Sequence, residues 1–440
     1  MTRSLRFLAL AFLFALPFGT AKFLVSFPFP FSNVYTGEYT SAFLWGTDVL
    51  LCALIAGALF LFSRRFGGLV RAWWPIPAFL SVALLSLLGA VYGGLGAYLF
   101  LRLVLAAGGA FALATLIREG IVGFRAIAIT LSASAVFQAL IGIYQTATDG
   151  DAGLHLLGEA IITPTTVGVG RVVLGDGELL RAMGTLPHAN IFAGFLILGL
   201  AAAFYLFLTR TEGKLRYGWV ATTVSIAVIL VGLITSFSRS GWLVAFALSV
   251  GILGIGFLRR ELRRHTVELL IILALMGGIF ATSLGWAIAP RAGFAPGEGS
   301  VAHRYLYNMI GIEMMEAHPG GVGVGNQLLV GVDEGRYQSR GLIVWWHWQP
   351  IHNLYLMIGA ETGIAGLALF VLFLALLILR ARPFFSGTSM ETNAAVTVLF
   401  ALLAFGLFDH FLWDLQVGRL MLWSVLGILI GVSASKTSHV

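Results

Sequence analysis

The sequence is dominated by a series of apolar stretches, each about 20 residues long, which is the length an α-helix needs to cross a bilayer. They fill nearly all of the 440 residues, of which 59% are hydrophobic and 11% charged. Soluble domains carry about 25% charged residues, so these proportions exclude a water-soluble globular protein. The stretches lack the alternation of β-barrel strands and predict an all-α polytopic integral membrane protein.

About twelve transmembrane helices are expected from these stretches. The tenth stretch is long for one crossing and contains Gly363 and Gly366, so its first turns are expected to form a separate half-helix at the membrane surface. We predict a single membrane domain over residues 1–440, because no repeat of fixed period divides the chain. The expected spans are 5–22, 41–62, 76–93, 97–117, 122–145, 188–209, 217–236, 241–258, 267–289, 352–380, 393–411 and 418–434.

The basic residues indicate how the chain is oriented in the membrane. With the N-terminus inside, most of the 27 Lys and Arg residues fall on the short inner connections, for instance in LRRELRR at 258–264. The positive-inside rule then places both termini in the cytoplasm. The net charge of +7 is therefore explained by orientation and by contact with membrane lipid headgroups. We expect no nucleic acid partner.

One basic residue lies inside an expected span. Arg102 is a few residues from the outer end of the fourth span, and Asp48 lies at a similar depth in the second. Because ionisable groups within a bilayer normally pair, we predict a buried ion pair between Arg102 and Asp48.

Two connections are much longer than the others, 146–187 and 290–351, and both fall on the outer, periplasmic side. Loops of this length are usually functional or disordered. In the second we expect a helix over 301–317, from its apolar residues at helical spacing, and a turn at 318–321. The tryptophans at 345–348 suit either a membrane interface or stacking against sugar rings.

Ionisable groups gather on this outer side. Arg181, Arg239 and Arg304 lie close to expected membrane ends, against the orientation bias. A guanidinium group presents a planar fork of donors that suits a phosphate or diphosphate; pairing with outer carboxylates is the alternative. His352 lies where the second long loop re-enters the membrane. Histidine suits a general base near neutral pH, although an interfacial hydrogen bond would also explain its position.

Other patterns indicate structure more than chemistry. Gly321-Val-Gly323-Val-Gly325 is not followed by a nucleotide-binding unit, so a turn is predicted there. Asp149-Gly150-Asp151 matches a D-x-D, which holds a metal in some glycosyltransferases, but a solvated turn is favoured. No phosphate-binding loop of the Walker type is present, which argues against an ATP-driven transporter.

Five segments together resemble the O-antigen ligase superfamily, which includes lipopolysaccharide O-antigen ligases, Wzy-type O-antigen polymerases and O-linked protein oligosaccharyltransferases. The first five spans resemble this family only in hydropathy. The segments are His352-Asn353 followed after nine residues by Gly363-x-x-Gly366, RAMGTLPHANIFAG at 181–194, SFSRSGW at 236–242, HRYLYNMIGIEMMEAHPGGVGVGN at 303–326 and FDHFLWDLQVGRL at 408–420.

The resemblance implies a GT-C-like, inverting, metal-independent glycosyltransferase without a cofactor, at the periplasmic face of the bacterial inner membrane. The implied donor is an undecaprenyl-diphosphate-linked glycan, and the acceptor is a hydroxyl of lipid A-core or of another glycan. The essential histidine of the family falls on His352. Its donor-binding arginines fall on Arg181 and Arg239 and, with a poorer match, on Arg304. The supporting residues within the matching segments are Asn190, Asn353, Gly363 and Gly366.

The acceptor and the class of protein leave alternatives open. We favour an O-antigen ligase, since the spacing from His352 to Gly366 resembles ligases most closely, with a polymerase as the alternative. The short tail after about residue 434 disfavours an oligosaccharyltransferase that grasps a protein. A transporter of lipid-linked glycans is the alternative from another class. It would be expected to carry ionisable groups near the bilayer midplane, whereas here they gather on outer loops.

Overall fold

The computed structural model is predominantly α-helical over its described residues, with short 3-10 turns, irregular loops and two antiparallel β-hairpins. This confirms the predicted fold class of an all-α polytopic membrane protein. The structure describes residues 1–27, 37–166, 168–174, 177–210, 216–283, 285, 299–382 and 387–433.

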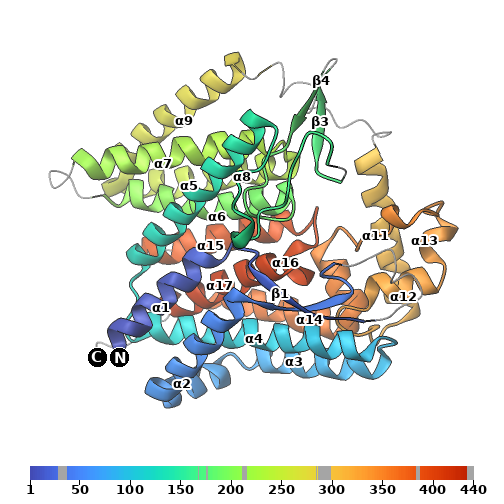
Figure 1. Cartoon of the computed structure of the whole chain (residues 1–440). Coiled ribbons are helices and arrows are strands. Elements are labelled where there is room, and N and C mark those ends of the chain that lie inside the picture. Colours follow the sequence, from blue (N-terminus) through green and yellow to red (C-terminus); the bar gives the residue numbers. More distant parts are fainter. Residues whose placement is uncertain are drawn as a thin grey trace. The chain divides into compact units, whose positions relative to one another are not determined.

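The chain divides into two compact units, each assembled from three segments. Figure 1 labels the helices and strands from which they are built. The first unit comprises Met1–Thr20, Glu119–Phe294 and Ala381–Phe405, and the second comprises Ala21–Arg118, Ala295–Arg380 and Gly406–Val440. The single membrane domain expected from the sequence stays a prediction.

Within the described part of the chain, nine helices are long and apolar enough to cross a membrane. The other three expected spans form shorter helices, α1 (Thr2–Ala15), α3 (Pro75–Ser86) and α15 (Met390–Phe405). The nine candidate spans are α2 (Gly46–Ala72), α4 (Gly93–Arg118), α5 (Phe124–Thr148), α6 (Ala189–Leu208), α7 (Arg216–Thr235), α8 (Arg239–Leu258), α9 (Arg263–Ser283), α14 (Leu354–Ala381) and α17 (Gln416–Ser433).

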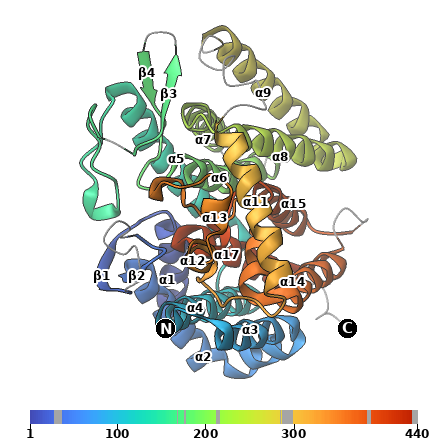
Figure 2. The ribbon, with the colours of Figure 1, turned by 90° about the vertical axis from the view of Figure 1, so that its right-hand side faces the viewer.

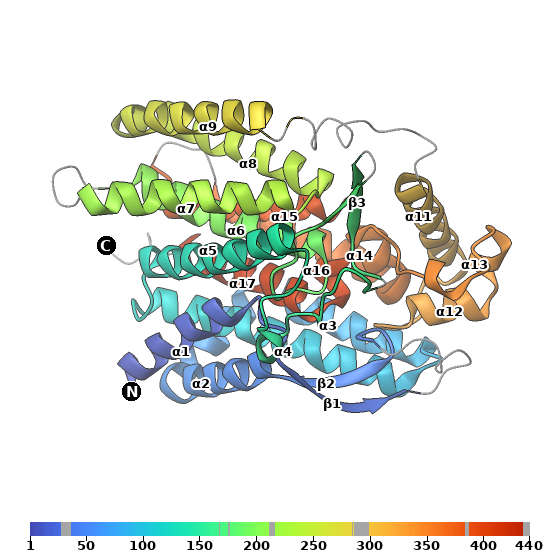
Figure 3. The same ribbon diagram turned by 45° about the horizontal axis from the view of Figure 1, so that its top comes forward.

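The first unit is a helical bundle around α6. Helices α5, α7, α8 and α15 all pack against α6 (Figure 3), which is buried along its whole length. A helix that is apolar on every side has no face suited to water, so its sequence favours burial within the bundle. Small residues allow close approach: a Cβ on Gly199 of α6 would lie 2.0 Å from the Cβ of Ala135 on α5.

The first long loop is held on the end of this bundle by side chains of α5. Gln145 accepts hydrogen bonds from the backbone amides of Met183 and Gly184, and Gln138 accepts one from Thr185. The loop contains a hairpin, β3 (Arg171–Leu174) and β4 (Gly177–Leu180), with Arg171 opposite Leu180. Buried amide side chains thus give this loop a defined structure.

In the second unit, α4 packs against both α2 and α17. A Cβ on Gly427 of α17 would lie 2.5 Å from the carbonyl oxygen of Ala110, so glycine allows the two helices to touch through their backbones. A hairpin of β1 (Ala21–Ser26) and β2 (Ser41–Trp45) precedes α2. The expected spans 5–22 and 41–62 therefore differ from the structure, because 21–22 and 41–45 are strands.

The predicted ion pair within the second unit is confirmed. Arg102 on α4 donates to both carboxylate oxygens of Asp48 at 2.9 Å. The two residues are 7% and 5% exposed. Asp48 also accepts hydrogen bonds from the Trp45 amide and from the Gln416 side chain, so the pair joins α2, α4 and α17.

The second long loop forms a group of short helices in the second unit, shown in Figure 2: α11 (Gly299–Ala317), α12 (Gln327–Asp333) and α13 (Arg336–Ser339). The first of these confirms the helix predicted over 301–317; residues 290–298 of the loop lie outside the described residues. A 3-10 turn, η4 (Trp345–His347), follows before the chain enters α14.

Helix α14 is broken at Gly363, which has φ 76° and ψ 176°, as its length and glycines predict. The segment before α12 packs against this break. The Ile364 amide donates to the Pro319 carbonyl oxygen, and the Gly323 amide donates to the Glu361 carbonyl oxygen. The predicted turn at 321–325 is also confirmed, since its three glycines have φ between 77° and 90°. Only glycine tolerates these conformations at so close an approach.

Candidate active site

The structure places His352 at the junction between the second long loop and α14. The side-chain oxygen of Asn353 accepts hydrogen bonds from the amides of Tyr355 and Leu356, so Asn353 caps the helix that begins directly after His352. The Leu354 amide donates to Gly406 at 2.7 Å. These contacts fix the start of α14 and therefore the backbone position of His352, which directly precedes it.

The backbone defines which nitrogen of His352 is basic. Its Nδ1 lies 2.8 Å from the carbonyl oxygen of Pro350. A carbonyl oxygen can only accept, so this contact assigns the hydrogen to Nδ1 and leaves the lone pair on Nε2. Neutral His352 is then a proton acceptor at Nε2, which is the state a general base requires.

An aromatic side chain of α11 adjoins His352 and connects it to further rings of α11 and η4. The Tyr307 ring stacks on the His352 ring at a centroid distance of 5.1 Å. The Tyr307 hydroxyl donates to the carbonyl oxygen of His347 at 2.7 Å. His303 lies one turn earlier on α11, 4.8 Å from the His347 ring. Three histidines and a tyrosine therefore form one row of rings within the second unit.

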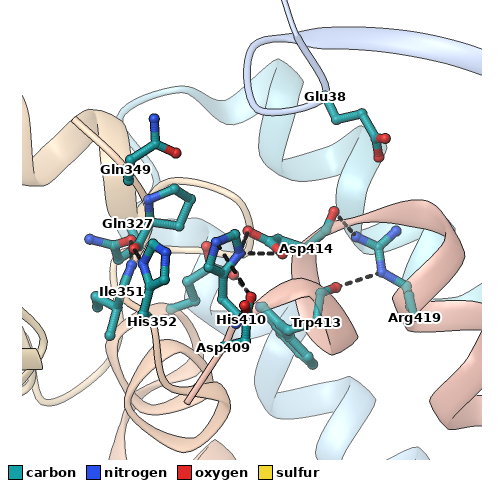
Figure 4. Close-up of polar contacts among 12 residues, drawn as sticks. Glu38, Gln327, Gln349, Ile351, His352, Asp409, His410, Trp413, Asp414 and Arg419 are labelled. Atoms are coloured by element: carbon teal, nitrogen blue, oxygen red, sulfur yellow. Dashed lines mark hydrogen bonds and ion pairs between the residues drawn. The ribbon is translucent and has the colours of Figure 1, made fainter. Parts of the chain in front are cut away.

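A second imidazole lies against His352 (Figure 4). The rings of His352 and His410 meet edge to face, with centroids 4.8 Å apart. His410 Nδ1 lies 2.8 and 2.9 Å from the two carboxylate oxygens of Asp414. Asp414 stands one turn later, in the short helix α16 (Phe411–Asp414). Asp409 is also close, 4.0 Å from His410 Nε2.

The two imidazoles differ in their affinity for a proton. Burial lowers the pKa of His352, and the neighbouring His410 lowers it further, although Asp409 acts in the opposite direction. Burial also opposes protonation of His410, but the charge and hydrogen bond of Asp414, together with the charge of Asp409, outweigh it, so the pKa of His410 is raised above its ordinary value. The surroundings of the pair therefore favour protonation of His410 over His352.

Behind Asp414 lies a small cavity with several charged groups. Arg419 donates to the carbonyl oxygens of Trp413 and Asp414 (Figure 4), while its Nη1 has no hydrogen-bond partner among the described residues. Glu38 accepts a hydrogen bond from the Gln416 amide, and burial raises the pKa of Glu38 to about 7. The lining of the cavity extends to Tyr98 and Arg102.

The position of α16 is held by a buried carboxyl group of α14. Trp413 Nε1 donates to Glu361 Oε2 at 2.7 Å, and Glu361 is 1% exposed. Glu361 lies two residues before the break at Gly363. The turn that carries His410 and Asp414 is thereby tied to the same helix that begins after His352.

The first unit contains a separate polar cluster at the start of two helices. Arg181 donates from Nε to the Ser236 carbonyl and from Nη2 to Asn190 Oδ1, and Ser238 also donates to Asn190 Oδ1. Asn190 is the second residue of α6, and Ser238 caps α8, whose first residue is Arg239. Two helix N-termini and two arginines provide positive potential that suits an anion.

The site residues predicted from the sequence thus fall into two groups. Arg181, Arg239 and Asn190 come together in the first unit. The second unit holds His352 and Asn353, together with the break at Gly363 and the adjacent Gly366. Arg304 also belongs to the second unit, where its charge acts on both His352 and His410.

His410, Asp414 and Tyr307 were not predicted as site residues from the sequence. A histidine followed four residues later by an aspartate, in FDHFLWD at 408–414, was an available signal. Residues four apart share one face of a helical turn. Neither the approach of this turn to His352 nor the stacking of Tyr307 on it has a local signature.

Within the described residues, one group has the composition of a cation site. Asp151, His155 and Glu159 bring their ligand atoms within 4.8 Å of one another. The oxygens of Glu159, however, already accept hydrogen bonds from Gln145, Ala152 and Leu154. Glu159 therefore stabilises the conformation of the loop. Asp149, the first residue of the D-x-D, ends α5 and pairs with Arg171. These contacts favour the turn predicted at 149–151.

These features define a class of protein: a multi-pass α-helical membrane protein in which histidines and carboxylates at the start of α14 and beside α16 are suited to proton transfer. Residues 224–371 match the family model described as O-antigen ligase. This segment of the chain is therefore similar to the O-antigen ligase family. The matched segment contains Arg239, Arg304 and His352, whereas Arg181 and His410 lie outside it.

Two further comparisons complete this picture. No curated protein matches the chain. A solved structure described as "Structural coordination of polymerization and crosslinking by a peptidoglycan synthase complex" contains a similar chain, at 16% sequence identity and a TM-score of 0.39. The similarity covers 84% of this chain and 98% of that one. At this TM-score the likeness does not bear on function.

Proposed function

We propose that this protein is an inverting glycosyltransferase that moves a glycan from undecaprenyl diphosphate to a sugar hydroxyl, and that it acts as an O-antigen ligase on lipid A-core. The observation that carries the proposal is the setting of His352. It has a basic Nε2, lies at the start of a helix and falls within the segment that matches the O-antigen ligase family.

In the proposed reaction, the acceptor hydroxyl oxygen attacks the anomeric carbon of the donor sugar. Nε2 of His352 takes the hydroxyl proton as the new C–O bond forms. The bond between the anomeric carbon and the diphosphate oxygen breaks, and the electron pair leaves with the diphosphate. Arg181 and Arg239 stabilise the charge that develops on this leaving group, with Arg304 as a further cation. The proposal gives no role to a metal or cofactor.

The proposal also assigns a side of the membrane. The long loops face the periplasm, both termini lie in the cytoplasm, and the protein resides in the bacterial inner membrane. The basic inner segments support this orientation through the positive-inside rule.

The test is glycan transfer by the purified protein in detergent, with undecaprenyl-diphosphate glycan as donor and with or without lipid A-core. We expect modification of the core by the wild type and at least a 10²-fold loss in His352→Ala, as for removal of a general base. His318→Ala is the matched control, because His318 belongs to the same loop but pairs with Glu334. Wild-type rates in His352→Ala would refute the base assignment.

The same assay separates the alternatives. Chain growth from the donor alone would identify a polymerase, and absence of transfer with either acceptor would favour the transporter. Loss of activity in EDTA would contradict the metal-independent mechanism. Arg181→Ala and Arg239→Ala should raise the KM for the donor, and undiminished donor use by both variants would remove their role in binding the diphosphate.

A further inference from the structure

A second imidazole, that of His410, lies beside His352, and the role inferred for it rests on the proposed role of His352 as a base. His410 is 5% exposed, Asp414 8% and Asp409 6%. Burial of a histidine between two carboxylates is costly unless the charges compensate one another. Both oxygens of Asp414 lie within 2.9 Å of His410 Nδ1, which is the arrangement that stabilises a doubly protonated imidazole.

The pair can hold one proton but not two near neutral pH. The centroids of the two rings are 4.8 Å apart, and two like charges at this separation in a buried site strongly disfavour each other. Groups that interact so closely titrate as a pair. The first proton goes where an anion compensates it, and only His410 has a carboxylate in direct hydrogen-bond contact among the described residues.

His352 lacks such a partner. Its Nδ1 faces the carbonyl oxygen of Pro350, and one face of its ring is covered by Tyr307. We propose that His410, held by Asp414, is a positioning residue that carries the proton of this pair and thereby keeps Nε2 of His352 unprotonated for glycan transfer.

The other charged and titratable groups around the pair come from four elements. Asp409 favours protonation of both histidines, and Arg304 on α11 opposes it. Tyr39 lies 6.2 Å from the His410 ring, and Tyr307 stacks on His352. On the far side of Asp414, Arg419 binds its backbone carbonyl and leaves the carboxylate to His410. A substitution of the Asp414 side chain therefore does not remove the contact with Arg419.

The proposal predicts the direction in which His352 titrates when His410 is changed. In His410→Gln, the competing cation is absent, so protonation of His352 becomes easier and occurs at higher pH. The glutamine amide can still donate to Asp414, which preserves the packing. In Asp414→Asn, the proton is no longer held on His410 and is shared with His352, so the titration shifts in the same direction.

The experiment is histidine NMR of the full-length protein labelled with ¹⁵N-histidine, titrated between pH 5 and 9. The His352 signals are assigned by comparison with His352→Gln. In the wild type we expect the His352 ring to stay neutral throughout. In His410→Gln and Asp414→Asn we expect its protonation to move upward, toward the ordinary histidine pKa near 6.5. His318→Gln is the matched control and should leave the His352 titration unchanged.

Glycan transfer supplies a second readout. At pH 5.5, transfer relative to pH 8.5 should fall by about tenfold in both variants, because the base is protonated one pH unit below its ordinary pKa. Unshifted His352 titration in both variants would overturn the proposal, as would an equal loss of transfer at every pH in His410→Gln. If the wild type transfers no glycan, the proposed function fails, while the NMR titration still decides whether His410 carries the proton.

Discussion

At the scale of single residues, Arg102 and Asp48 show how one ion pair supports the second unit. Both are nearly inaccessible to solvent, and Asp48 also binds the Trp45 amide and Gln416. Removing one partner of a buried ion pair leaves a charge without compensation, which typically costs about 3–5 kcal/mol. We therefore expect Arg102→Ala to unfold at a clearly lower temperature in detergent, measured by loss of the monodisperse peak after heating.

The charge swap provides the sharper measurement. Arg102→Asp combined with Asp48→Arg should recover part of the stability that each single variant loses, since the pair is restored with reversed polarity. Recovery should be incomplete because an arginine at position 48 cannot accept from the Trp45 amide. The half-exposed pair Arg340–Glu313 is the control, and its removal should cost at most about 1 kcal/mol. A double variant no more stable than the singles would contradict the coupling.

Among the helices and strands, the break in α14 is the feature most sensitive to a single substitution. Gly363 has a positive φ, and a Cβ there would lie 2.5 Å from the Pro319 carbonyl oxygen. Forcing a side-chain residue into such a conformation costs about 1–3 kcal/mol. Gly363→Ala should therefore displace the 319–325 turn and reduce glycan transfer. Gly254→Ala in α8, where a Cβ would meet nothing within 4 Å, is the control. Equal transfer by both variants would show that the break is not required.

The elements also show what hydropathy can and cannot predict. The interruption of α14 and the helix over 301–317 were predictable, because glycine spacing and apolar periodicity are local properties. The hairpin of β1 and β2 was not, since 41–45 continues into the apolar run of α2. Its strand conformation depends on a contact from another helix: Tyr98 on α4 accepts from the Phe43 amide and donates to its carbonyl.

In the whole molecule, the candidate site likewise combines features that local sequence predicts with features that depend on tertiary contacts. His352 could be proposed as a candidate from the sequence, because it stands where a polar loop meets an apolar helix. The pairing of His352 with His410 could not, since it arises from the tertiary contact between α16 and the start of α14. Arg181 and Asn190 belong to one segment, but their link to Ser236 and Ser238 also depends on how α6 and α8 pack.

The orientation of the whole molecule in the membrane yields the last prediction. Cys52 is the only cysteine, so a Cys52→Ala background allows single cysteines to report their side. Leu156 in the first long loop is 89% exposed and Ile343 in the second is 72% exposed, while the Arg264 side chain at an inner connection is 73% exposed. A membrane-impermeant maleimide applied to cells with a permeabilised outer membrane should label Leu156→Cys and Ile343→Cys. Arg264→Cys should react only after the inner membrane is opened. The reverse pattern would place His352 on the cytoplasmic side, where the proposed periplasmic transfer cannot occur.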